Sequence, residues 1–127
     1  MQALTGEWVS KAENDFAAAD LTLHGGEAPI SDAACFHCQQ CAEKYLKAFL
    51  QEYDVEFPRQ HPLIPLMELC MGIDKSFGTL LEDLDSLDGF AVAVRYPGAV
   101  VSAEQAERAF ESVGRVRKFV RKKLGVK

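Results

Sequence analysis

Three cysteines and one histidine lie close together in the segment ACFHCQQCAEKYLKAFL, residues 34–50. Thiolates and imidazoles are the usual ligands of zinc, and cysteines at this spacing also surround iron–sulfur clusters. A zinc site needs ligands that converge on one point, about 2 Å from each donor atom. On a helix, however, Cys35 and Cys41 lie about 9 Å apart along the axis, and His37 points almost the opposite way. The segment has no glycine and favours a helix, so we predict core cysteines, no metal site and no cofactor.

The polar side of this predicted helix carries an aromatic residue, Phe36, among Gln40, Glu43, Lys44 and Lys47. An aromatic ring among hydrogen-bonding and charged groups suits a surface that contacts a ligand or a partner chain. The alternative is a solvated face on which Glu43 and Lys47 form an i, i+4 ion pair, worth roughly a few tenths of a kcal/mol. The residues alone leave both interpretations open.

A second candidate site is the segment Arg95-Tyr96-Pro97. A guanidinium group binds phosphate through two hydrogen bonds, and a tyrosine ring stacks on a nucleobase. Arg95 and Tyr96 are therefore candidates for contact with a nucleotide. The alternative is that Arg95 pairs with a carboxylate such as Glu43, and that the segment only turns the chain.

His61 is the candidate for proton transfer, because imidazole titrates near neutral pH. Its place directly before Pro62 also fits a residue that begins a helix and hydrogen-bonds locally. The other two histidines, His24 and His37, are interpreted as surface residues.

The charged residues are unevenly distributed along a chain whose formal net charge is −5. This net charge argues against an extensive nucleic-acid-binding surface but allows a local basic patch. The chain after Val113 is basic, with Arg115, Arg117, Lys118, Arg121, Lys122, Lys123 and Lys127, whereas residues 74–88 contain Asp74, Glu82, Asp83, Asp85 and Asp88. The basic residues are candidates for contact with RNA, an anionic nucleotide or an acidic partner. Alternatively, the two patches pair between copies, or each is simply solvated.

Helical periodicity places these candidates on a small number of elements. Apolar residues follow a helical spacing from Trp8 to Leu23, and a second helix is expected from caps at Ser31 and Asp32 to about Tyr53. Further helices are predicted from His61-Pro62, over residues 80–94, and after the capping-box sequence of residues 102–105. No alternating strand pattern occurs. Short connections of about four to eight residues favour antiparallel neighbours, so we predict an all-α, up-and-down bundle in a single domain of residues 1–127.

Length and composition agree with one globular domain. The 127 residues are 48% hydrophobic and 26% charged, which is typical of a folded protein with its own core. The N-terminus lacks the pattern of a signal peptide, and no apolar stretch approaches the roughly 20 residues of a spanning helix. Cysteines without a secretory signal are expected to be reduced. We therefore expect a cytoplasmic protein that does not enter a membrane.

Four segments in order, WVSKAENDFAAAD, CFHCQQCAEKYLKAFL, QHPLIPLMEL and RYPGAVVSAEQAERAF, resemble the HEPN domain (higher eukaryotes and prokaryotes nucleotide-binding). The resemblance spans the chain from Trp8 to the last predicted helix. It implies a bundle of four to five helices that forms a homodimer. It also implies a minimal nucleotidyltransferase as partner, frequently within a toxin–antitoxin pair. Many family members are metal-independent endoribonucleases that carry an arginine followed, four to six residues later, by a histidine.

The sequence departs from this ribonuclease motif. Arg59 precedes His61 by only two residues, and no histidine follows Arg95. We therefore assign no catalytic residue and expect a nucleotide- or nucleic-acid-phosphate-binding domain that acts with its nucleotidyltransferase partner. Its predicted contacts with ligand or partner are made by Gln40, Lys44, Lys47, Arg95 and Tyr96. The alternatives are an endoribonuclease with an atypical site built from His61 and Arg95, and a scaffold that only binds another protein.

Overall fold

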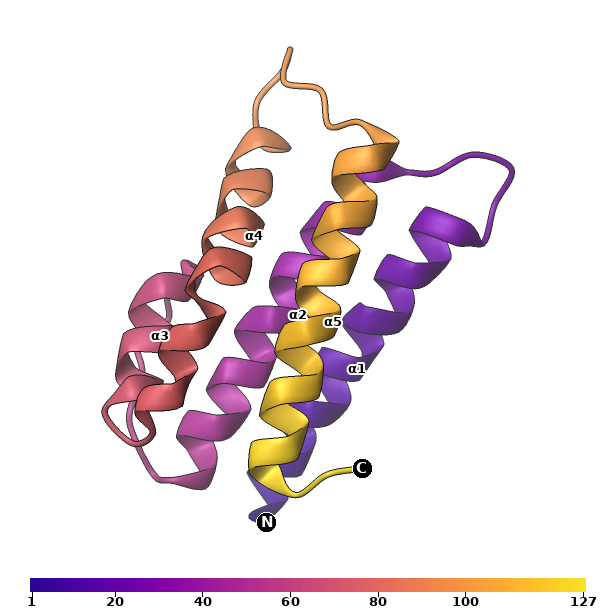
Figure 1. Ribbon diagram of the computed structural model, residues 1–127. Helices are drawn as coiled ribbons and strands as arrows, with labels where there is room; N and C mark the ends of the chain where they lie inside the picture. Colours follow the sequence, from indigo (N-terminus) through magenta and orange to yellow (C-terminus); the bar gives the residue numbers. More distant parts are fainter.

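The computed structural model describes residues 1–127 and contains helices but no strands (Figure 1). The elements are α1 (Ala3–His24), α2 (Ser31–Glu52), α3 (Leu63–Met71), the 3-10 helix η1 (Lys75–Leu80), α4 (Leu81–Ala93) and α5 (Ala103–Leu124). They form the helical bundle that the apolar periodicity predicts. None of the helices combines the length and hydrophobicity needed to span a lipid bilayer.

α2 is the central element of the bundle, since it packs against α1, α3, α4 and α5. Its residues Cys35, Cys38 and Cys41 have no exposed surface. Burial raises the pKa of the Cys35 thiol to about 11 and that of Cys38 to about 12, because the low-dielectric core disfavours a thiolate. The cysteines are therefore core residues, as the helical wheel predicts. No group of three or more metal-ligating side chains lies together in the structure.

The N-termini of α5 and α2 show whether the side chains predicted to cap these helices do so. At α5, the Ser102 hydroxyl accepts a hydrogen bond from the Gln105 N–H at 3.0 Å, and the Gln105 side chain accepts one from the Ser102 N–H at 2.9 Å. This confirms the predicted capping box. At α2, the predicted caps are wrong: the helix begins at Ser31 itself, Ile30 occupies the N-cap position, and no side chain caps it. Ser31 already has helical geometry, so its hydroxyl cannot serve as the cap.

α3 depends on a distant carboxylate for its first turn. It begins at Leu63, directly after the predicted start at His61-Pro62, and the Leu63 N–H donates to Asp88 of α4 at 2.8 Å. Pro65 lies in this first turn, where its missing N–H removes no helical hydrogen bond. The N-terminus of α3 is therefore hydrogen-bonded to the middle of α4.

η1 precedes α4 and lies almost entirely before the predicted helix of residues 80–94, so the sequence pattern did not predict it. The Asp74 carboxylate accepts a hydrogen bond from the Ser76 N–H at 3.0 Å and so begins the 3-10 turn. Phe77 and Leu80 of η1 are both buried. Their i, i+3 spacing places both side chains on the same side of the 3-10 helix.

Many of the clustered charges neutralise one another within the chain. Ion pairs join Arg115 to Asp83 at 2.8 Å, Lys123 to Asp74 at 2.8 Å and Arg117 to Glu13 at 2.6 Å. Three of the C-terminal basic residues make no ion pair, namely Lys118, Lys122 and Lys127. Two residues of the acidic segment, Asp74 and Asp83, are thus paired with basic residues of α5 in the same molecule.

Candidate functional site

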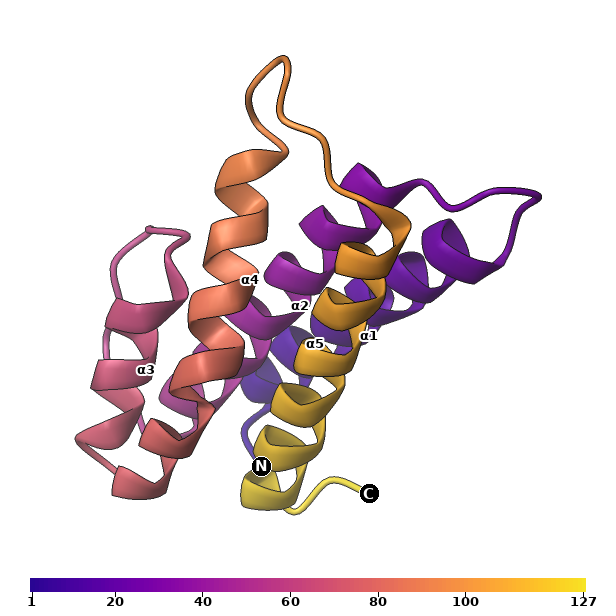
Figure 2. The ribbon, with the colours of Figure 1, turned by 45° about the horizontal axis from the view of Figure 1, so that its top comes forward.

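A cleft of about 590 Å³ opens beside α2, between the loop that precedes α3 and the C-terminal part of α4. Its main lining residues are Gln39, Arg59, His61, Asp88, Ala91 and Arg95. The Gln39 side-chain amide donates to the backbone carbonyl of His61 at 2.8 Å, which fastens the loop to α2. The connection that carries Arg95 projects beyond the ends of α4 and α5 (Figure 2).

Positive charge predominates in the cleft. The Arg59 and Arg95 side chains are exposed and make no ion pair with any carboxylate of the chain. The cleft has one acidic lining residue, Asp88, and its carboxylate is already bonded to the first turn of α3. Burial raises the pKa of Asp88, because a low-dielectric environment disfavours the charged carboxylate. The two guanidinium groups are therefore free to bind an anion.

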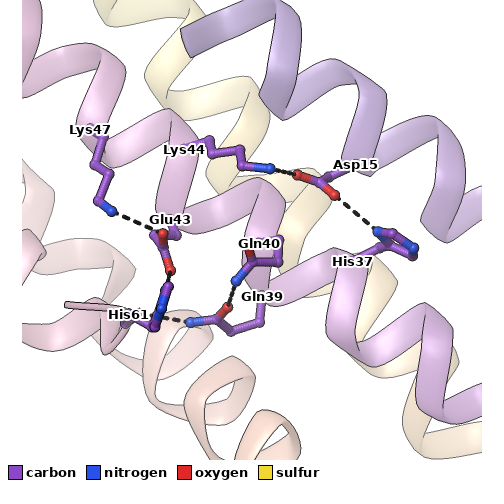
Figure 3. A network of polar contacts seen from close by, with 8 residues as sticks. All are labelled: Asp15, His37, Gln39, Gln40, Glu43, Lys44, Lys47 and His61. Atoms are coloured by element: carbon purple, nitrogen blue, oxygen red, sulfur yellow. Dashed lines mark hydrogen bonds and ion pairs between the residues drawn. The ribbon is translucent and has the colours of Figure 1, made fainter. Parts of the chain in front are cut away.

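His61 reaches the cleft as the exposed end of a buried polar network (Figure 3). Its Nδ1 lies 3.0 Å from Glu43, and the other oxygen of Glu43 lies 3.0 Å from Lys47 Nζ. Glu43 and Lys47 are only 3% and 6% exposed, whereas the His61 side chain is 62% exposed. The i, i+4 pair proposed from the sequence is thus present, but it is buried rather than solvated. Because Glu43 bonds His61 and Lys47, it is not the partner of Arg95.

A second network of the same composition lies between α1 and α2 (Figure 3). The carboxylate of Asp15 contacts His37 Nδ1 at 2.9 Å and Lys44 Nζ at 2.5 Å, and Asp15 is 8% exposed. His37 lines a smaller cavity of about 320 Å³ together with Phe36 and Arg95. Asp15 is therefore directed into the bundle, where it binds two side chains of α2.

The arrangement of helices around this cleft matches a known family. The family model described as "HEPN domain" matches residues 5–123. The chain belongs to the HEPN family. The crystal structure of an archaeal HEPN homologue superposes with a TM-score of 0.74 at 26% identity, over 97% of this chain and 98% of that one. Among curated proteins, none matches the chain.

In this HEPN domain, the predicted ligand contacts occupy different environments. Arg95 lines the cleft, whereas Tyr96 is 64% exposed and lies outside its lining. Lys44 and Lys47 bind Asp15 and Glu43, respectively, and the Gln40 amide donates to Gln39 at 2.9 Å. The structure therefore places Arg95 and His61 on the same cleft. The other predicted contacts on α2, Gln40, Lys44 and Lys47, do not line it. Those three residues remain predictions as partner contacts.

Sequence reasoning did not identify Arg59 or Gln39 as parts of the site. Arg59 had a usable signal, since it lies two residues before His61 in the polar loop segment PRQHP, and loops commonly carry binding residues. Gln39 offered no such signal. Its role depends on the position of His61, 22 residues further along the chain.

Proposed function

We propose that this HEPN domain binds the phosphate groups of a nucleotide or of a nucleic acid in the cleft, and that it acts with a minimal nucleotidyltransferase. The observation that carries the proposal is the meeting of Arg59 and Arg95, both without an internal partner, on one concave surface. Guanidinium groups match phosphate oxygens through paired, charge-assisted hydrogen bonds. The cleft thus provides a cationic binding site on a chain whose net charge is negative.

The volume of the cleft and the aromatic residue in the adjoining cavity suit a nucleotide. Its volume of about 590 Å³ lies within the range of typical small-molecule sites. The adjoining cavity shares Arg95 and adds Phe36, which is 50% exposed. An exposed ring beside a phosphate-binding arginine offers a surface on which a base can stack.

Substitution of the two arginines tests the proposal. We expect Arg95→Ala and Arg59→Ala each to weaken binding of ADP and of inorganic pyrophosphate about 10- to 100-fold, since a charge-assisted hydrogen bond contributes about 1.5–3 kcal/mol. Arg108→Ala is the matched control, because Arg108 is an exposed arginine of α5 that does not line the cleft. Calorimetric titration measures the affinity, and circular dichroism checks the fold. Unchanged binding in both cleft variants would refute the site assignment.

Homodimer formation and the nucleotidyltransferase partner are supported by membership of the HEPN family. Exposed apolar residues, namely Phe36, Val92 and Tyr96, also offer surface for a second copy around the cleft. Native mass spectrometry tests the dimer. Co-purification after co-expression with a minimal nucleotidyltransferase encoded next to this chain tests the partner. A monomer that retains no such protein would count against both.

A second candidate function is RNA cleavage with His61 as proton acceptor. The observation that favours it is the presence of His61 and Arg95 on the same cleft, which places a base near a phosphate-binding cation. Cleavage of a fluorescent single-stranded RNA in the presence of a chelator, lost in His61→Ala, would support this function. Equal cleavage by the wild type and His61→Ala would exclude it.

A further inference from the structure

The buried ion pair between Glu43 and Lys47 is unusual for a small domain. Both residues are at least nine-tenths buried, and moving two charges out of water carries a desolvation cost that their mutual attraction often fails to offset. The pair holds no two helices together, because both residues belong to α2. Its one hydrogen bond to another segment of the chain is that between Glu43 and His61. This points to a role in the placement of His61.

Lys47 is enclosed so that its ammonium group has one carboxylate partner. Its Nζ lies 5.6 Å from the ring centres of both Trp8 and Phe57, which stabilise the charge through their π-electrons. Its hydrogen bond occupies one oxygen of Glu43, and the other oxygen accepts from His61. Lys47 thereby fixes the orientation of the Glu43 carboxylate.

The contact with Glu43 determines which nitrogen of the His61 ring carries hydrogen. A carboxylate accepts hydrogen bonds, so Nδ1, at 3.0 Å, must be the donor. In the neutral ring the hydrogen on Nδ1 leaves Nε2 without one. Because the ring lines the cleft and is largely exposed, Nε2 is the nitrogen available to a ligand. It offers a lone pair rather than a hydrogen.

We propose that Glu43, held by Lys47, is a positioning residue that keeps His61 in the Nδ1–H tautomer, so that Nε2 accepts a hydrogen bond from a ligand hydroxyl. This inference rests on the proposed phosphate-binding function and specifies its ligand class. A fully ionised phosphate has only acceptors to offer, so an Nε2 without hydrogen is matched by a ligand with a hydroxyl donor beside the phosphate. In RNA the 2′-hydroxyl is on the carbon next to the 3′-phosphate, which makes a ribonucleotide the matching ligand.

Nuclear magnetic resonance of the imidazole nitrogens tests the tautomer directly, at alkaline pH where imidazole is neutral. The His61 signal, identified by its loss in His61→Gln, is expected to show hydrogen on Nδ1. Glu43→Gln is expected to shift it toward the Nε2–H form. The matched control is Asp15→Asn in the second network, which is expected to alter His37 and leave His61 unchanged. An Nε2–H tautomer in the wild-type protein overturns the inference, and the only variant that this readout needs is His61→Gln, in which the exposed side chain is replaced.

Ligand discrimination provides the second readout. Wild-type protein is expected to bind adenosine 3′-monophosphate about 3- to 10-fold more tightly than its 2′-deoxy analogue, as expected for one neutral hydrogen bond. Glu43→Gln, or Glu43→Gln with Lys47→Met if the single variant does not fold, is expected to bring this ratio close to one. Affinity for inorganic pyrophosphate is expected to change little. A ratio that stays the same overturns the inference.

The experiments distinguish a failure of the proposed phosphate binding from a failure of the proposed role of Glu43. If wild-type protein does not bind pyrophosphate, the proposed phosphate-binding function is wrong, while the wild-type tautomer still decides the role of Glu43. If pyrophosphate binds but the ribonucleotide and its deoxy analogue bind equally, the phosphate site stands and the ligand class is wrong.

Discussion

Replacement of Lys47 by methionine is expected to destabilise the domain far more than a typical surface substitution. The change keeps most of the side-chain volume between Trp8 and Phe57 but removes the ammonium group from Glu43. Glu43 is then left almost fully buried, with His61 as its remaining hydrogen-bond partner. A buried carboxylate without its cation is costly because neither water nor a counter-charge stabilises it.

The magnitude follows from the burial of the two side chains, 8% exposed for Lys47 and 4% for Glu43. Removal of one member of such a pair costs about 3–5 kcal/mol. We expect the lower value, about 3 kcal/mol, since the His61 ring still donates to Glu43. For a domain of this length the entropy of unfolding is roughly 0.27 kcal/mol/K, so the melting temperature should fall by about 11 °C.

Urea denaturation followed by the fluorescence of Trp8, the single tryptophan of the chain, measures the free energy of unfolding. Lys44→Met is the matched control, because Lys44 also pairs with a carboxylate that retains a histidine partner, but its side chain is 23% exposed. We expect this control to lose about 1 kcal/mol, as for a partly solvated pair.

The double variant Glu43→Leu/Lys47→Met separates charge burial from packing. Removal of both charges leaves no unpaired group between them, so most of the stability lost in Lys47→Met should return. A loss below about 1 kcal/mol in Lys47→Met, or a double variant no more stable than the single one, would refute the assignment of a desolvated ion pair.

Three further predictions concern other parts of the bundle. Ser102→Ala should lower the free energy of unfolding by about 1 kcal/mol, because the cap of α5 is lost; urea denaturation measures it, and no change would contradict the capping box. Native Cys38 should react with a thiol reagent only after unfolding, since burial raises its pKa to about 12; fast labelling of folded protein would contradict its burial. Hydrogen bonds to Asp20 and Glu107 raise the pKa of His24 above 6.5, so its stabilising contribution is complete below that pH and disappears as the pH rises through the raised value. The difference in melting temperature between wild type and His24→Gln should therefore be larger at about pH 5.5 than at about pH 8.5.

Local patterns of the chain determine its elements and its core. The apolar stripe of α1 and the buried arc of Cys35, Cys38 and Cys41 follow from the 3.6-residue period. The capping box of α5 involves residues only three positions apart. Such features depend on backbone geometry within one turn, so the sequence alone predicts them. The η1 turn and the start of α2 at Ser31 escaped this reasoning, because short-range patterns locate a helix better than they locate its first residue.

The cleft, by contrast, is a product of tertiary packing. Asp88 binds the start of α3 across 25 residues, and Glu43 binds His61 across 18. From spacing alone, Glu43 pairs equally well with Lys47 on its own helix or with Arg95 elsewhere. Burial of α2 against its neighbours decides which partners Glu43 binds. A carboxylate removed from water has to be hydrogen-bonded, so it binds the donors that packing places next to it. Spacing along the chain determines which face of a helix a residue occupies, while packing of the helices determines which distant group meets it.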